Sequence, residues 1–238
     1  MKKLILLSTV VAAGVVLAGD VETSNSYGVL PVTTSQKATM VAVPFVGDGD
    51  NISIAQMVKA QGLSVGDMIY ALPTTGGSSY SAWVLNAVKS AWVSAVSADV
   101  GSGVSITAPA SETATIARGQ AFWLVRGSAT ETTFYVMGIG DTTAAADTTI
   151  TGSENGTWNL VGQSSATGTK TLDDIASVVG TKGSVRLNNG DRYLYTGSAW
   201  KRLAKDAPNN PVDVDSNTRL PVGEGFWIVS KRSGSVAL

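Results

Sequence analysis

One pattern of hydrophobic positions occurs twice along the chain. The segments GQAFWLVRGS (119–128) and GEGFWIVSKRSGS (223–235) both place a glycine ahead of a Phe-Trp pair and an aliphatic run. A continuous apolar run of this length is typical of a buried strand. Trp123 and Trp227 lie within these runs, so we expect both indoles in the core. The repetition itself predicts that one fold is formed twice.

The residues ahead of each run predict one short helix per copy. Ser53 and Thr171 can each cap a helix, and apolar residues follow both of them at helical spacing. Gly62 and Gly180 then supply the glycine that commonly ends a helix. Each helix is therefore expected to bury one side against its own copy.

A hairpin is expected after each helix. Its first strand opens with Gly-Asp, at residues 66–67 and at residues 190–191. Glycine in the connection permits the tight turn that a hairpin needs. On the return strand, Ser81-Ala82-Trp83 matches Ser198-Ala199-Trp200. This alignment predicts that Trp83 and Trp200 occupy equivalent places.

Together these elements predict a mainly β protein of two tandem homologous modules, sandwich- or barrel-like, each with one short α-helix. Residues 20–36 have no counterpart in the repeat, and Pro31 makes the strand expected at Tyr27–Val32 an edge strand. The expected organisation, in chain order, is a signal peptide (1–18), an N-terminal extension strand (19–36), a first module (37–138), a linker (139–153) and a second module (154–238).

Two segments of the second copy carry a family resemblance. Trp158-Asn159-Leu160-Val161 and Gly223-Glu224-Gly225-Phe226-Trp227-Ile228 resemble exported bacterial surface proteins whose modules open with a W-N-L-[IV] strand and close with a G-x-G-[FY]-W-[IV] strand. The first copy departs from this pattern, with Val41-Ala42-Val43-Pro44 at its start and Gln120-Ala121 in its second signature. The resemblance covers most of residues 38–238. It implies an extracellular location and β-rich modules, and it implies no catalytic residues.

The first residues have the form of a secretory signal peptide. Lys2 and Lys3 precede an apolar stretch from Leu4 to Leu17, and Ala18 suits a cleavage site. A membrane-spanning helix needs about 20 apolar residues, more than this stretch provides. A lipoprotein signal would need cysteine where Asp20 stands. The alternative is a pilin-like leader, which is not removed and serves as an assembly helix. We expect a secreted, cell-surface protein that touches membrane only through its leader before cleavage.

The amino-acid composition limits which ligands and reactions are expected. The chain has 17 Lys and Arg against 18 Asp and Glu, so it offers no basic stripe for nucleic acid. It has no His and no Cys, which removes the usual pairs of nucleophile and base. Ser198 and Lys201 have Ser-x-x-Lys spacing, but a strand would point them to opposite faces. Asp67 and Asp191 are interpreted as equivalent turn residues and not as paired carboxylates, so we expect no enzymatic activity.

Two acidic loops offer oxygen ligands for calcium. Asp213, Asp215 and Asn217 alternate along the chain, and Glu224 falls at the twelfth place of an EF-type loop. Thr218 stands at the sixth place, where such loops need glycine. A shorter acidic stretch lies at residues 48–51. Solvated turns are the favoured interpretation of both loops, so calcium is the only cofactor considered.

The expected role is structural: a subunit of an extracellular filament, sheath or surface layer that self-associates into a homopolymer. Val29 and Leu30 would anchor the extension strand on the sheet edge of a neighbouring subunit, unless that strand pairs within its own module. The alternative is a carbohydrate-binding or adhesive module without catalytic activity. Trp83 and Trp200, and with them Trp92, would then stack on sugar rings. A third interpretation, a cell-wall hydrolase, is not favoured.

Overall fold

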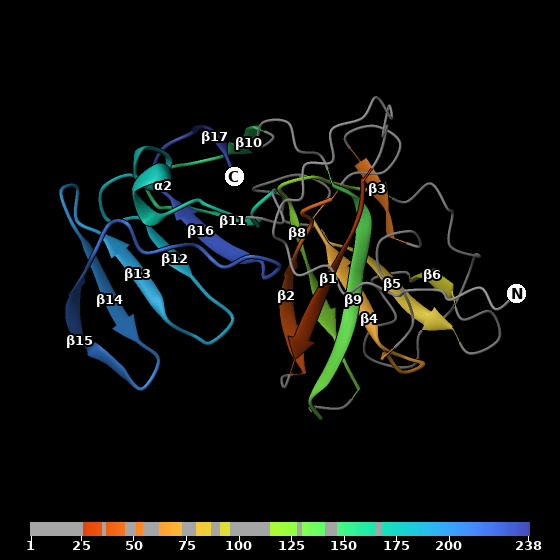
Figure 1. The fold of residues 1–238 in the computed structure, drawn as a ribbon. Helices are drawn as coiled ribbons and strands as arrows, with labels where there is room; N and C mark the ends of the chain where they lie inside the picture. The colour runs from red at the N-terminus through yellow and green to blue at the C-terminus, as the bar shows by residue number, and fades with distance from the viewer. Residues whose placement is uncertain are drawn as a thin grey trace, which may run out of the picture.

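The computed structural model describes residues 26–34, 37–45, 51–54, 62–72, 80–86, 91–95, 115–127, 130–140, 147–164 and 168–238. Over these residues the protein is mainly β, with antiparallel sheets and one helix. Figure 1 shows two bodies side by side, the first coloured red to green and the second teal to blue. Neither large sheet closes on itself, so the arrangement is sandwich-like and not a barrel. The expected signal peptide, the first helix beyond Ile54 and the acidic residues 48–50 lie outside the described residues.

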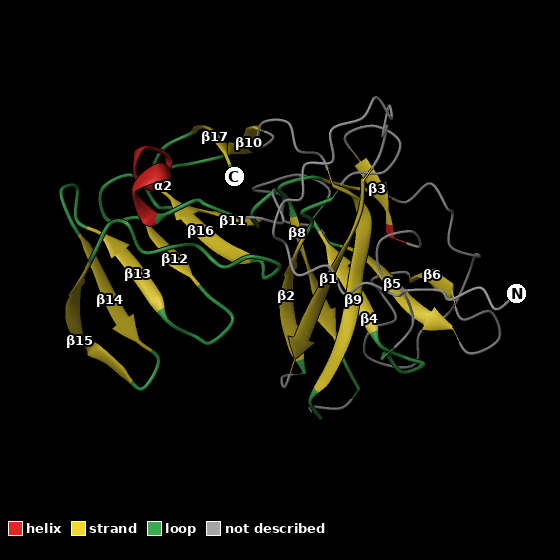
Figure 2. Cartoon of the chain, in the orientation of Figure 1, coloured by secondary structure: helices red, strands yellow, loops and turns green. Residues whose placement is uncertain are grey.

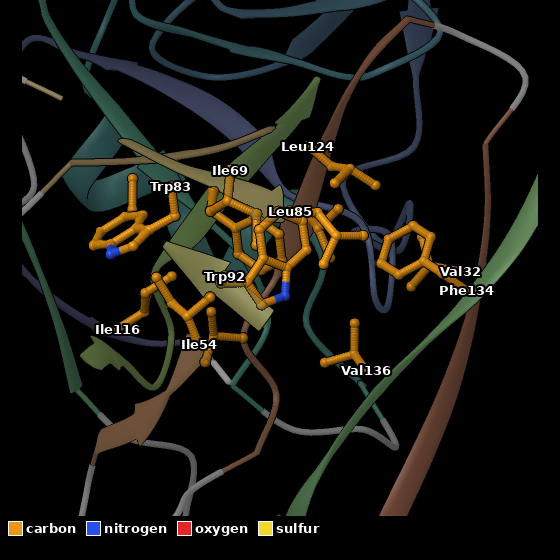
Figure 3. Packing of buried hydrophobic residues seen from close by; sticks show 14 of the residues in the cluster. Val32, Ile54, Ile69, Trp83, Leu85, Trp92, Ile116, Leu124, Phe134 and Val136 are labelled. Carbon is orange, nitrogen blue, oxygen red and sulfur yellow. The ribbon is translucent and has the colours of Figure 1, made fainter. Parts of the chain in front are cut away.

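The first module is built on a five-stranded antiparallel sheet. Its order is β2 (Ala38–Ala42), β8 (Ala121–Val125), β4 (Met68–Ala71), β5 (Ser81–Asn86) and β6 (Ala91–Ala95). Two ribbons complete it, β1 (Ser26–Thr34) with β9 (Thr132–Gly140) and β3 (Asn51–Ser53) with β7 (Thr115–Ala117). Figure 3 shows the core between sheet and ribbon, where Phe134 and Val136 of β9 pack with Leu124 of β8.

The second module is built on a six-stranded sheet and a helix. The sheet order is β11 (Thr157–Val161), β16 (Phe226–Ser230), β12 (Ser184–Arg186), β13 (Arg192–Tyr195), β14 (Trp200–Ala204) and β15 (Ala207–Val214). A ribbon of β10 (Asp147–Ile150) and β17 (Gly234–Ala237) lies beside it. Helix α2 (Leu172–Val179), red in Figure 2, buries Ile175 and Val179 against the sheet's inner face. At its start, the Thr171 N–H donates to the Asp174 carboxylate (2.8 Å), as the capping pattern predicts.

The two sheets have the same order of equivalent strands. Phe122 lies opposite Val41, and Phe226 lies opposite Val161, so the Phe-Trp strands hold the same place and register. Continuing across each sheet, β4, β5 and β6 correspond to β12, β13 and β14. The second sheet adds β15 as its last strand.

The tryptophan alignment of the hairpins was wrong. Trp83 lies opposite Ile69 on β5, and the residue in that place of the second module is Tyr193, opposite Val185. Trp200 lies one strand further out, and its equivalent is Trp92 on β6. The Ser-Ala-Trp triplet occurs twice in the first copy, at residues 81–83 and 90–92, and the alignment used the earlier one.

Each module also begins with a strand that pairs with its own last strand. β1 pairs with β9 over nine residues, and β10 pairs with β17. The extension therefore has a counterpart, β10, which lies inside the expected linker 139–153. Val29 and Leu30 are paired within their own module, opposite Met137 and Val136. The extension strand that was expected to pair with a neighbouring subunit therefore pairs with β9 of its own chain.

The modules meet through backbone hydrogen bonds that obey a local two-fold symmetry. The Ala42 N–H donates to the Gly223 carbonyl (3.0 Å), and the Gly162 N–H donates to the Gly119 carbonyl (3.1 Å). Ala42 and Gly162 are equivalent in the two modules, as are Gly119 and Gly223, so each bond is the image of the other. Isolated bridges with the same symmetry join Val41 to Glu224 and Gln120 to Val161.

Small residues bring the two backbones together near this local axis. Gly162 faces its own equivalent, Ala42, and a Cβ atom on the glycine would overlap the Ala42 Cβ. Gly225 likewise faces its equivalent, Ala121, where an added Cβ would lie 2.6 Å from the alanine Cβ. Both contacts pair an alanine of the first module with a glycine of the second. The approach is possible because one partner of each pair has no side chain.

Trp123 and Trp227 cover this junction and do not fill the module cores. Phe122 and Phe226 are fully buried, whereas the tryptophans that follow them are only partly buried. Adjacent residues on a strand point to opposite faces, so the phenylalanines face inward and the tryptophans outward. The two indoles pack against one small apolar cluster formed by Met40, Leu72, Ala121 and Leu160. The expectation that both indoles are core residues was therefore wrong.

Candidate functional site

The outer face of the second sheet carries an exposed tryptophan held by two neighbours. Trp158 of β11 is 43% exposed. Its ring meets Trp227 of β16 edge to face, with centroids 5.4 Å apart and planes at 86°. The guanidinium carbon of Arg186, on β12, lies 4.7 Å from the centroid of Trp158. Three neighbouring strands thus fix one indole at the surface.

The alternation of β11 explains why this indole points outward. Asn159 and Val161 are fully buried on the inner face, so Trp158 and Leu160 face the opposite side of the sheet. The Asn159 side chain accepts a hydrogen bond from the Thr151 N–H (3.0 Å) and donates to the Thr151 (2.8 Å) and Thr157 (3.0 Å) carbonyls. Because Asn159 is anchored inward, Trp158 must lie on the outer face.

A pair of arginines extends the site across the sheet. Arg186 and Arg192 stand directly opposite each other on β12 and β13. Among the described residues no carboxylate forms an ion pair with either guanidinium, since the ion pairs there are Arg126–Asp67, Lys201–Asp213 and Arg202–Asp191. The Arg192 Nε atom is buried and has no hydrogen-bond partner within the described ranges. Burial lowers the pKa of Arg192, and the charge of Arg186 lowers it further.

The tryptophans expected to stack on sugars are buried. Trp83, Trp92 and Trp200 are 8%, 2% and 1% exposed, and all three lie on inner faces of the sheets. Sequence reasoning missed Trp158, which it placed in an apolar strand. No local signal in the sequence could have found it, because asparagine is usually exposed and alternation would then have placed Asn159 outside and Trp158 inside.

The residues expected to bind calcium have other partners. Asp213 binds the Lys201 ammonium (2.6 Å), and Asp215 accepts from the Asn217 backbone N–H (2.9 Å). The Glu224 carboxylate accepts from the Asn188 side chain (3.2 Å), near the junction. Over the described ranges no group of three or more acidic, His or Cys side chains could hold a metal ion. The structure does not bring the four predicted ligands into one cluster.

The other candidate groups are held in turns and at strand ends. Asp67 accepts hydrogen bonds from the Ser64 and Gly127 N–H groups (2.9 and 3.0 Å). Asp191 binds Arg202, with 2.6 Å between the closest atoms. Asp67 precedes β4 and Asp191 precedes β13, which are not equivalent strands, so their expected equivalence was wrong. Ser198 lies in the exposed turn before β14.

No protein-family model matches this chain, and no curated protein or solved structure is significantly similar to it. No helix within the described ranges is both long and apolar enough to cross a membrane. The fold defines the protein as a two-module, antiparallel β protein. Any functional assignment must therefore follow from the geometry of the outer face.

Proposed function

We propose that this chain is an extracellular, non-catalytic surface protein that binds carbohydrate through the outer face of its second module. The observation that carries the proposal is the exposed Trp158 ring, which is in contact with Trp227 and Arg186. The signal-like first residues and the W-N-L and G-x-G-F-W segments support the extracellular location.

A fixed indole suits sugar binding for a physical reason. The flat, apolar ring can cover the C–H face of a sugar, while polar groups beside it bind the hydroxyls. A ring already held by its neighbours loses little side-chain freedom when a ligand arrives, and this lowers the cost of binding. Trp158 combines a large exposed area with such support. The exposed valines Val29, Val65 and Val212 have no flat ring to offer a sugar.

The test is binding of the purified chain to a panel of immobilised glycans. We expect binding to at least one class, weakened about tenfold or more by Trp158→Ala, as for a central aromatic contact. Tyr80→Ala is the matched control, because Tyr80 is an exposed aromatic residue of the first module and is 39% exposed. Absence of binding to every glycan, or equal loss with both variants, would contradict the proposal.

A structural role is the second candidate, and the junction favours it. Backbone hydrogen bonds and close glycine contacts join the two modules into one unit, which suits a subunit of a larger assembly. The open edge of the second sheet is β15, and its Pro208 and Pro211 disfavour strand pairing, so subunits would have to associate through another surface. Electron microscopy and light scattering of the purified protein test this role. Filaments or sheets formed by the protein alone would support it, and a monodisperse monomer would exclude it.

A further inference from the structure

The arginine pair on the outer face is unfavourable as a purely structural feature. Like charges directly opposite each other on neighbouring strands destabilise a sheet. Arg186 and Arg192 stand in this relation, and neither is neutralised by a carboxylate in the part of the chain that the structure describes. In addition, the Arg192 Nε has no hydrogen-bond partner there. An anion placed between the two guanidinium groups would relieve the like-charge contact.

We propose that the second module selects acidic glycans, with Arg186 and Arg192 binding the carboxylate of a uronic-acid residue while Trp158 covers an adjacent sugar ring. This inference rests on the proposed carbohydrate-binding function and names its substrate class. Guanidinium groups present planar N–H donors that match a carboxylate in a two-bonded arrangement. Arg186 is exposed, its guanidinium lies over the face of Trp158, and none of the ion pairs among the described residues involves it, so its donors can reach a ligand.

The remaining charges on this face leave the arginines dominant. Residues that are opposite each other across β12, β13, β14 and β15 share a face, which places Lys201 and Asp213 on the same side as Arg186 and Arg192. Lys201 and Asp213 neutralise each other at 2.6 Å. Of these four charged residues, only the two arginines lack a charge partner, within a chain whose formal net charge is −1. Such a sparse positive site fits carboxylates spaced along a sugar chain better than the dense phosphates of nucleic acid.

The first module has the same strands without this chemistry. Tyr70 is equivalent to Arg186, because each lies opposite the tryptophan of its Phe-Trp strand. Ala82 is equivalent to Arg192, because each lies opposite that residue on the next strand. Ala38 holds the place of Trp158. The scaffold therefore does not require these side chains, and their presence in one module only is explained by a ligand.

The experiment compares an oligogalacturonide of defined length with its carboxyl-reduced, neutral counterpart, using calorimetry on the full chain. We expect the acidic oligosaccharide to bind at least about tenfold more tightly, and added salt to weaken only that binding. Arg186→Gln and Arg192→Gln should each weaken acidic binding about ten- to a hundredfold, the usual effect of losing a charge-assisted hydrogen bond.

Lys201→Gln is the matched control. It removes one positive charge from the same face, but Lys201 is already paired with Asp213. We therefore expect less than about a twofold change in acidic binding. The thermal midpoint of Arg192→Gln should equal or exceed that of the wild type, because a like-charge contact is relieved. A lower midpoint together with unchanged acidic binding would assign Arg192 a structural role and overturn the inference.

Three other outcomes would also overturn the inference of acidic-glycan selection. They differ in whether the proposed carbohydrate-binding function is kept. Equal binding of both oligosaccharides, sensitive to Trp158→Ala but not to the arginine variants, would reject acid selection and keep the proposed function. Arginine-dependent binding of single-stranded DNA without binding of the oligogalacturonide would assign the site to nucleic acid. Binding of other neutral glycans alone would retain carbohydrate recognition and reject the uronic acid.

Discussion

Where the second module carries Trp158 and Arg186 on its outer face, the first carries Ala38 and Tyr70. The inner faces are more alike, since both modules bury a phenylalanine and then an aliphatic residue on the corresponding strand. The comparison separates two kinds of constraint. Inner positions must fill a core of fixed shape, whereas outer positions away from the junction are free to differ and can acquire a ligand.

The largest expected effect tests whether Trp92 and Trp200 are true equivalents. Both are buried, at 2% and 1% exposed, in modules with the same strand order. We expect Trp92→Ala and Trp200→Ala each to lower the free energy of unfolding by about 3–5 kcal/mol, measured by urea denaturation. Trp158→Ala should cost less, about 1 kcal/mol, because Trp158 is 43% exposed and fills no core. If Trp92→Ala were as mild as Trp158→Ala, the two modules would differ in their cores as well.

An intermediate effect tests the symmetry of the junction. Gly162→Ala places a methyl group against Ala42 and should cost about 1–3 kcal/mol. Adding Ala42→Gly exchanges the two residues across the local axis and should restore most of this loss, giving an interaction energy of about 0.5–3 kcal/mol in a double-mutant cycle. Gly127→Ala is the control, since a Cβ atom there meets nothing within 4 Å. Additive effects of the two junction changes would show that these residues are not in contact.

The smallest effect concerns the start of helix α2. Asp174→Ala removes the acceptor of the Thr171 N–H and should cost about 1 kcal/mol near neutral pH. That hydrogen bond is the main reason why the pKa of Asp174 lies below its ordinary value of 3.8. The contribution is therefore complete above that value and disappears as the pH falls through the lower pKa of the folded state.

Thermal unfolding of both proteins across acid pH provides the measurement. The difference between wild type and Asp174→Ala should shrink as Asp174 becomes protonated. Asp173→Ala is the control, because Asp173 is also acidic and lies in the same first turn. A difference that stays constant down to the lowest pH would show that the charge of Asp174 does not stabilise the helix.

The sequence was sufficient to predict the strand-rich fold and the second helix. The Phe-Trp strands and the Thr171 cap were predicted because apolar runs and capping residues act locally. Which face of each strand is buried was not predictable, since a run that is apolar at every position has no alternation. This is why Trp123 and Trp227 were assigned to the cores.

The other errors arose from contacts between distant parts of the chain. β10 reads Asp-Thr-Thr-Ile, a polar stretch that becomes a strand because β17 pairs with it. The expected spare strand at Val29 and Leu30 had the same origin, because its partner β9 lies about a hundred residues away. The candidate site was missed for the same reason, since Trp158, Arg186 and Arg192 come together only once the four strands β11, β16, β12 and β13 have paired.

The local two-fold at the junction also determines how the molecule responds to dilution. A symmetric interface of this kind uses the same patch on both sides and closes on itself, leaving no free copy of the patch for a third module. Both partners belong to one polypeptide, so their effective concentration is set by the chain and not by the solution. The junction is therefore expected to persist at any protein concentration. Covalent fusion also allows what a homodimer forbids, namely different residues in the two halves, as Ala42 and Gly162 already show.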